Sequence, residues 1–83
     1  KKAGLIFVLE LKIILKNYDD IEAFSEAIKE CDYDIFLISG NSRVNAKSTL
    51  GIYCLDHSNP MTLQAHTDSD PQLAERLAPF IER

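Results

Sequence analysis

The sequence predicts an α+β fold: an open-faced sandwich in which a four-stranded antiparallel sheet is covered on one face by three helices, in the chain order βαββαβα. Two observations predict it. Some segments alternate apolar with polar residues, as strands with one covered face do, and others repeat apolar residues every three or four positions, as amphipathic helices do. The 83 residues suit one domain, 1-83, with a small core.

The first two elements are a strand and a helix. Apolar residues at alternate positions predict a strand over Leu9–Lys16. Asn17 is a good helix cap, and Asp19 and Asp20 fall in the first turn, where the helix dipole favours negative charge, so a helix is expected over Tyr18–Glu30. Its expected buried stripe consists of Ile21, Phe24, Ala27, Ile28 and Cys31.

A β-hairpin is expected next. The segment Asp34–Ser39 is dense in isoleucine and phenylalanine and predicts a second strand. Gly40 and Asn41 suit a tight turn that requires positive backbone angles. The segment Ser42–Ala46 is therefore expected to return as an antiparallel third strand.

Ser48 is expected to open a short second helix. Its side-chain oxygen can accept a hydrogen bond from the free amides of the first turn. The Ser-Asn-Pro sequence within Asp56–Pro60 predicts a loop that ends the helix. The apolar residues of this helix are Leu50, Ile52, Tyr53 and Leu55. At least two of the first three are expected in the core.

The last strand and helix have clear patterns. Met61–His66 alternates apolar and polar residues and predicts a strand with one covered face. Ser69 or Asp70 is expected to cap a helix over Pro71–Glu82, and Pro79 should loosen its final turn because proline lacks a backbone donor. The expected buried stripe of this helix is Leu73, Leu77, Phe80 and Ile81.

The composition excludes several classes of partner. The net charge is −4 and the 9 basic residues are scattered, so no nucleic-acid or anionic-membrane partner is expected. The apolar run Leu5–Leu15 is too short to cross a bilayer and is interrupted by Glu10 and Lys12, so we expect a cytoplasmic protein. Residues Lys1–Gly4 are expected to be tag-derived or disordered, or a native start without its methionine.

Cysteines and histidines form no metal or cofactor motif. Cys31 and Cys54 have no CxxC spacing, and His57 and His66 complete no metal-ligand pattern, so no metal and no cofactor are expected. Two thiols are too few for a secreted disulfide framework. Both cysteines are therefore expected to be reduced core residues.

The segment Val44–Ile52, Val-Asn-Ala-Lys-Ser-Thr-Leu-Gly-Ile, resembles the stretch around the regulatory serine of HPr, the phosphocarrier of the bacterial sugar phosphotransferase system. The expected element order is similar to that family's over nearly the whole chain, with weaker matches at Phe24, at Asp34–Ile35 and at the acidic start of the last helix. The resemblance implies an HPr-like open-faced sandwich and a protein of the phosphotransferase system that is not an enzyme.

The sequence departs from the family at the start of the first helix. HPr carries its phosphoryl group there on a histidine in a Gly-x-His-x-Arg-Pro stretch, where the imidazole is the nucleophile and the arginine stabilises phosphate. Counted back from Ser48 without gaps, the histidine, arginine and proline positions are Asn17, Asp19 and Asp20. An amide is no nucleophile towards phosphate and two carboxylates repel it, so we predict no phosphohistidine carrier activity.

Ser48 is the remaining candidate site. The resemblance implies that HPr kinase/phosphorylase acts on Ser48 and that the phosphorylated face docks on a transcriptional regulator such as catabolite control protein A, as in Crh-type paralogues that lack the histidine. Arg43 and Lys47 are the candidate phosphate-adjacent cations, and Leu50 and Ile52 are candidate docking residues. The alternative is that Ser48 is only a helix cap.

Two other functions stay open at this stage. Strand-helix-strand-strand-helix-strand is also the order of small-molecule-binding modules of the ACT kind, although the segment Lys47–Gly51 and the extra helix Pro71–Glu82 favour the HPr-like interpretation. A degenerate HPr domain with a structural or oligomerising role is the other alternative. The long first strand could then support a homodimer by edge pairing.

Overall fold

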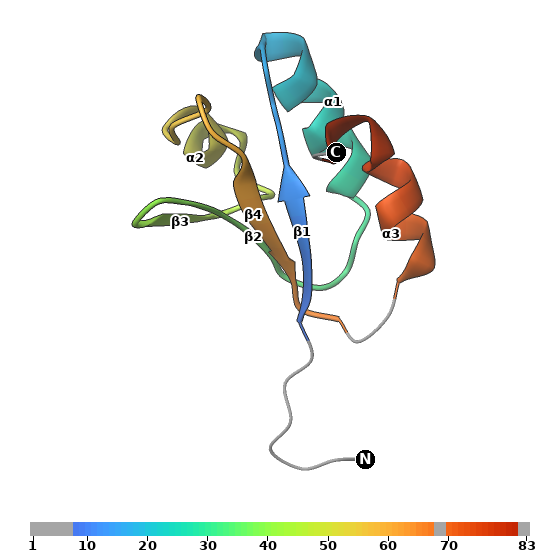
Figure 1. The fold of residues 1–83 in the computed structure, drawn as a ribbon. Helices are drawn as coiled ribbons and strands as arrows, with labels where there is room; N and C mark the ends of the chain where they lie inside the picture. The colour runs from blue at the N-terminus through green and yellow to red at the C-terminus, as the bar shows by residue number, and fades with distance from the viewer. Residues whose placement is uncertain (1–7, 68–69, 82–83) are drawn as a thin grey trace.

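The structure, a computed structural model, describes residues 8–67 and 70–81. The strands are β1 (Leu9–Ile13), β2 (Ile35–Ser39), β3 (Ser42–Asn45) and β4 (Met61–Ala65). The helices are α1 (Tyr18–Ile28), α2 (Thr49–Tyr53) and α3 (Pro71–Arg76), followed by the 3₁₀ turn η1 (Ala78–Phe80). Figure 1 shows this arrangement. The predicted features at Lys1–Gly4, Ser69 and Glu82 lie outside the described residues.

The strands form one antiparallel sheet in the order β1-β4-β2-β3. In its register, Leu63 of β4 lies between Leu11 of β1 and Leu37 of β2. Gly40 has a φ of +60° and begins the turn that joins β2 to β3, as the hairpin pattern predicts, whereas Asn41 does not have the positive φ that was also expected there. The buried residues of the helices and of the sheet's inner face belong to one cluster, so the predicted fold class is confirmed.

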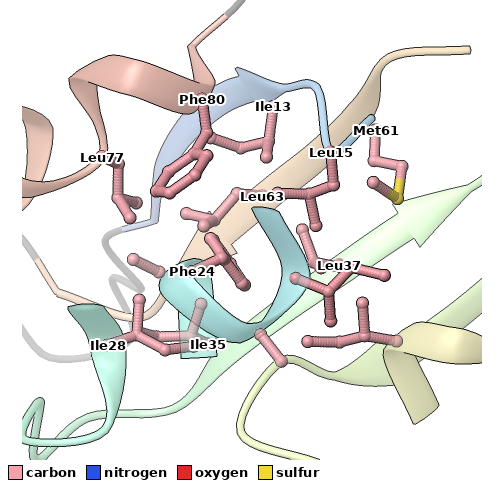
Figure 2. Close-up of a cluster of buried hydrophobic side chains, with 14 of the residues drawn as sticks. Ile13, Leu15, Phe24, Ile28, Ile35, Leu37, Met61, Leu63, Leu77 and Phe80 are labelled. Carbon is pink, nitrogen blue, oxygen red and sulfur yellow. The ribbon is translucent and has the colours of Figure 1, made fainter. Parts of the chain in front are cut away.

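The core lies between the sheet and the helices. Phe24 of α1 is fully buried and meets Phe80 of η1 edge to face, with ring centroids 6.0 Å apart. Figure 2 shows these two rings next to Ile13 and Leu63 from the sheet. The buried apolar residues that form this core are Ile13, Leu15, Ile21, Phe24, Ile28, Cys31, Ile35, Leu37, Ala46, Ile52, Leu55, Met61, Leu63, Ala65, Leu73, Leu77 and Phe80.

Two elements end at least three residues earlier than the patterns predict. Strand β1 stops at Ile13, opposite the first residue of β4, and the next amide, that of Ile14, donates to the carbonyl of Phe80 at 2.7 Å. Helix α3 stops at Arg76, because Pro79 has no N–H to continue the helix, and the chain continues as the tighter η1 turn. The C-terminal segment therefore closes onto β1 near the start of α1.

Cys31 is buried as expected, whereas the prediction that Cys54 lies in the core is wrong. Cys54 ends the five-residue helix α2, and the neighbours that turn inwards are Ile52 and Leu55. A helix this short presents only one side to the core, so Cys54 faces solvent.

Candidate functional site

The start of α1 is built by a reciprocal pair of hydrogen bonds. The Asn17 side-chain oxygen accepts from the Asp20 amide at 2.9 Å, and the Asp20 carboxylate accepts from the Lys16 amide at 2.9 Å. These bonds satisfy backbone donors that a helix start leaves free. At the position where the family resemblance expects a nucleophilic histidine, the chain thus has an amide that serves as a helix cap.

His57 lies closer to this region than its place in the sequence suggests. It borders a hollow of about 320 Å³ together with Asn17 and Tyr18. The ring Nε2 is 2.7 Å from the carbonyl oxygen of Ile52, so this nitrogen carries the proton and donates. The ring Nδ1 is buried and has no partner among the described residues. Neither ring nitrogen is therefore open to attack on a phosphoryl donor in this conformation.

Ser48 caps α2 as predicted. Its hydroxyl oxygen accepts from the Gly51 amide at 3.3 Å, a long bond, and the side chain is exposed. Helix α2 lies tightly on β3, because a Cβ at Gly51 would come within 3.3 Å of the Val44 Cβ. The serine hydroxyl is therefore held by a weak bond at a firmly placed helix start and is accessible to solvent.

The two candidate cations do not turn to Ser48. The Arg43 guanidinium lies 3.9 Å from the centroid of the Phe36 ring, a cation–π contact. Arg43 alternates with Val44, which packs on the core, so it lies on the sheet's open face. The Lys47 ammonium donates to the carbonyl of Cys31. Both cations thus have other contacts in this structure, and their role beside a phosphate on Ser48 stays a prediction.

The apolar residues of α2 divide differently from the prediction. Ile52 is fully buried, which excludes it as a docking residue, whereas Leu50 is 79% exposed and Tyr53 37% exposed. The prediction that at least two of the three lie in the core is therefore wrong. The Tyr53 ring stacks on exposed Tyr18 of α1 at 5.6 Å, and its hydroxyl donates to Glu22 at 2.9 Å. We call Tyr18, Leu50 and Tyr53 the α1–α2 patch.

A tyrosine–aspartate pair ties the loop before β2 to the start of α3. The Tyr33 hydroxyl donates to the Asp70 carboxylate at 2.6 Å, and Asp70 also caps α3 by accepting from the Gln72 amide. Burial and this hydrogen bond raise the pKa of Tyr33 well above its ordinary value. The bond from Tyr33 lowers the pKa of Asp70. The pair is a structural clamp between two distant segments.

Metal and membrane features are not found in residues 8–67 and 70–81. No group of three or more histidine, cysteine, aspartate or glutamate side chains in these ranges could hold a metal ion. None of the helices there is long and apolar enough to span a bilayer.

Three features of the site escaped the sequence patterns. These are the position of His57 beside Asn17, the stacking of Tyr18 on Tyr53 and the bond from Tyr53 to Glu22. All three bring the start of α1 or its first turns near residues far along the chain, which no local periodicity records. The one local signal was Tyr18, an aromatic residue next to a helix cap and outside the predicted buried stripe.

No protein-family model matches the chain, and no curated protein matches its sequence. Among solved structures, the chain is similar to one described as the crystal structure of HPr-C-His from Thermoanaerobacter tengcongensis. The two chains are 22% identical, with a TM-score of 0.66, and the match covers 87% of this chain and 86% of the other. The fold is therefore HPr-like, as the resemblance at Val44–Ile52 implied.

Proposed function

We propose that this HPr-like protein does not carry a phosphoryl group on histidine, and that it acts through contacts with other proteins under control of phosphorylation at Ser48. The observation that carries the proposal is the start of α1, where Asn17 occupies the cap and uses its side-chain oxygen to bind the Asp20 amide. The HPr-like fold supports a role in the same class of system.

Three features oppose a carrier function. The amide of Asn17 has no lone pair that attacks phosphorus readily, unlike an imidazole nitrogen. Asp19 and Asp20 in the first turn repel an incoming phosphoryl group. His57, the histidine that borders the same hollow, has its Nε2 bound to a carbonyl and its Nδ1 buried.

Ser48 has the geometry of a phosphorylation site. Its side chain is exposed and its cap bond of 3.3 Å is easily given up. A phosphate there adds roughly one and a half to two negative charges at the amino-terminal end of α2, where free amides can receive it. The modified serine would lie at the N-cap of the five-residue helix that carries exposed Leu50, so a partner such as a transcriptional regulator could contact both.

The regulatory part is tested by incubation with HPr kinase/phosphorylase and ATP, followed by mass spectrometry. We expect one phosphate on Ser48, no incorporation in Ser48→Ala, and full incorporation in Ser42→Ala, which removes another exposed serine on the neighbouring β3. No phosphate, or a phosphate that persists in Ser48→Ala, would remove Ser48 as a regulatory site.

The non-carrier part is tested separately with phosphoenolpyruvate and the general phosphotransferase enzyme. We expect the protein to remain unlabelled, because Asn17 offers no nucleophile. An acid-labile phosphohistidine would refute this part, and its loss in His57→Gln would identify the histidine.

A further inference from the structure

The described residues include four exposed large apolar side chains, and three of them belong to α1 and α2. They are Val8, Tyr18, Leu50 and Tyr53, and the last three form the α1–α2 patch. Tyr18 is 65% exposed and Leu50 79% exposed. A group of apolar side chains left in water beside polar residues is typical of a protein-binding surface.

The negative charge of the protein lies next to this patch. The segment 17–30 has five acidic residues and one basic residue, which account for the whole net charge of −4, because the rest of the chain has eight of each. Asp19, Glu22 and Glu26 are exposed and follow at three- and four-residue spacing, so they share one side of α1. Glu26 also forms a surface ion pair with Lys29 at 3.2 Å.

Direct contacts join the acidic side of α1 to the patch. Glu22 accepts a hydrogen bond from Tyr53 of the patch at 2.9 Å, and Tyr18 stacks on the same tyrosine. One turn further along α1, the hydroxyls of Ser25 and Thr49 lie 3.3 Å apart. The patch and the acidic side of α1 therefore form one continuous surface across two helices.

We propose that this surface binds a partner protein that presents lysine or arginine side chains around an apolar anchor. The proposal deepens the proposed function, since it rests on the premise that the protein acts through protein contacts, and it names the charge of the partner. Complementary charges speed encounter and reject partners of the wrong sign. Anionic membranes and nucleic acids are excluded by the same negative field.

The expected charge of the partner is opposite to the charge that an arginine at the family's position would attract. The position where the resemblance expects an arginine is Asp19, and the ammonium of Lys47, next to Ser48, is bound to the carbonyl of Cys31. A phosphate on Ser48 would add negative charge to the same surface. Phosphorylation would then strengthen the binding of a basic partner.

The experiment uses the unmodified protein and two helical peptides, one of leucine and lysine and the other with every lysine replaced by glutamate. Titrations are followed by the backbone amide chemical shifts of the protein. We expect saturable shifts at the α1–α2 patch with the lysine peptide, weaker binding as salt rises, and no binding of the glutamate peptide.

Matched variants assign the effect to this surface. Leu50→Ala should weaken the binding of the lysine peptide about tenfold. Val8→Ala, which shortens an exposed apolar side chain before β1, should leave this binding unchanged. Asp19→Lys combined with Glu26→Lys should weaken it about tenfold, whereas the same reversal at exposed Glu75 of α3 should have little effect.

Three outcomes would overturn the proposal. They are equal binding of both peptides, shifts centred on the open face of the sheet, and self-association of the free protein through the α1–α2 patch. The titration needs neither a kinase nor Ser48, so its failure would leave the phosphorylation proposal intact. If the kinase experiment failed, the titration would still test the preference for a basic partner.

Discussion

Three helix caps show how single side chains set the chemistry of this protein. Asn17, Ser48 and Asp70 each accept a hydrogen bond from an amide of the first helical turn. The sequence predicted Asn17 and Ser48 and named Asp70 as one of two choices, because capping depends on residues close in sequence. The contacts of the cations near Ser48 could not be predicted in this way. Lys47 and Arg43 bind Cys31 and Phe36, which lie elsewhere in the chain.

Replacement of Asn17 by alanine should destabilise the protein by about 1 kcal/mol, because the Asp20 amide loses its acceptor. Urea unfolding measures the change. Asn17→Ser keeps an oxygen that can cap the helix and should be close to the original protein in stability. If the serine variant were as unstable as the alanine variant, the cap would not be the role of Asn17.

Stability should depend on the Tyr33–Asp70 bond in a pH-dependent way. Because the pKa of Asp70 is held below its ordinary value of 3.8, the carboxylate stabilises the fold fully above that value and loses its contribution as the pH falls through the lowered pKa. Tyr33→Phe removes the bond. The gap in stability between the two proteins should therefore be largest near neutral pH and should shrink below pH 3.8.

Urea unfolding of both proteins over this pH range tests the bond between Tyr33 and Asp70. Tyr53→Phe is a matched control, because its hydroxyl donates to Glu22 instead and leaves Asp70 untouched. A gap between the original protein and Tyr33→Phe that stayed constant down to the lowest pH would show that Asp70 gains nothing from the tyrosine.

The five-residue helix α2 contains both a fully buried and a highly exposed apolar side chain. Ile52 is fully buried, Leu50 is 79% exposed, and Gly51 allows the helix to lie against Val44. The apolar composition of this helix was visible in the sequence, but the choice of buried residue was not. The choice depends on how the helix is rotated against β3 and α1, which is a tertiary property.

Truncation of the two apolar neighbours of Gly51 should have very different effects on the stability of the protein. Ile52→Ala should cost about 2–5 kcal/mol, because it opens a cavity in the core, and Leu50→Ala should change stability by no more than about 0.5 kcal/mol. Denaturant unfolding compares the two variants directly. Similar losses in both would mean that Leu50 is not the exposed residue described here.

The remaining elements show the same division between local and tertiary information. Alternation located β1 and β4, the density of isoleucine and phenylalanine located β2, and the turn at Gly40 located the hairpin and β3, because all of these signals lie within a few residues. The end of β1 was predicted three residues too late. The last residue of β1 pairs with Met61, the first residue of β4. Because these two residues are far apart in the sequence, a local periodic pattern cannot show where the pairing ends.

At the scale of the whole molecule, the buried core is separate from an exposed surface that is both apolar and acidic. The inner face of the sheet and the helices share one core, while the exposed apolar residues and the negative charge meet across α1 and α2. In this HPr-like fold the core keeps the helix starts in place, so the surface residues at those starts can differ without a change of architecture.

A core substitution should weaken the fold as a single unit. Leu63 lies at the centre of the sheet and is fully buried, so Leu63→Ala should cost about 2–5 kcal/mol, a large share of the roughly 5–15 kcal/mol typical of a domain. Gln64→Ala on the opposite face should cost far less. Circular dichroism and the fluorescence of the three tyrosines should give coincident urea transitions for both variants, with the midpoint of Leu63→Ala lowered and its slope unchanged. Transitions that separated would show that the helices and the sheet unfold independently, because a shared core requires them to lose structure together.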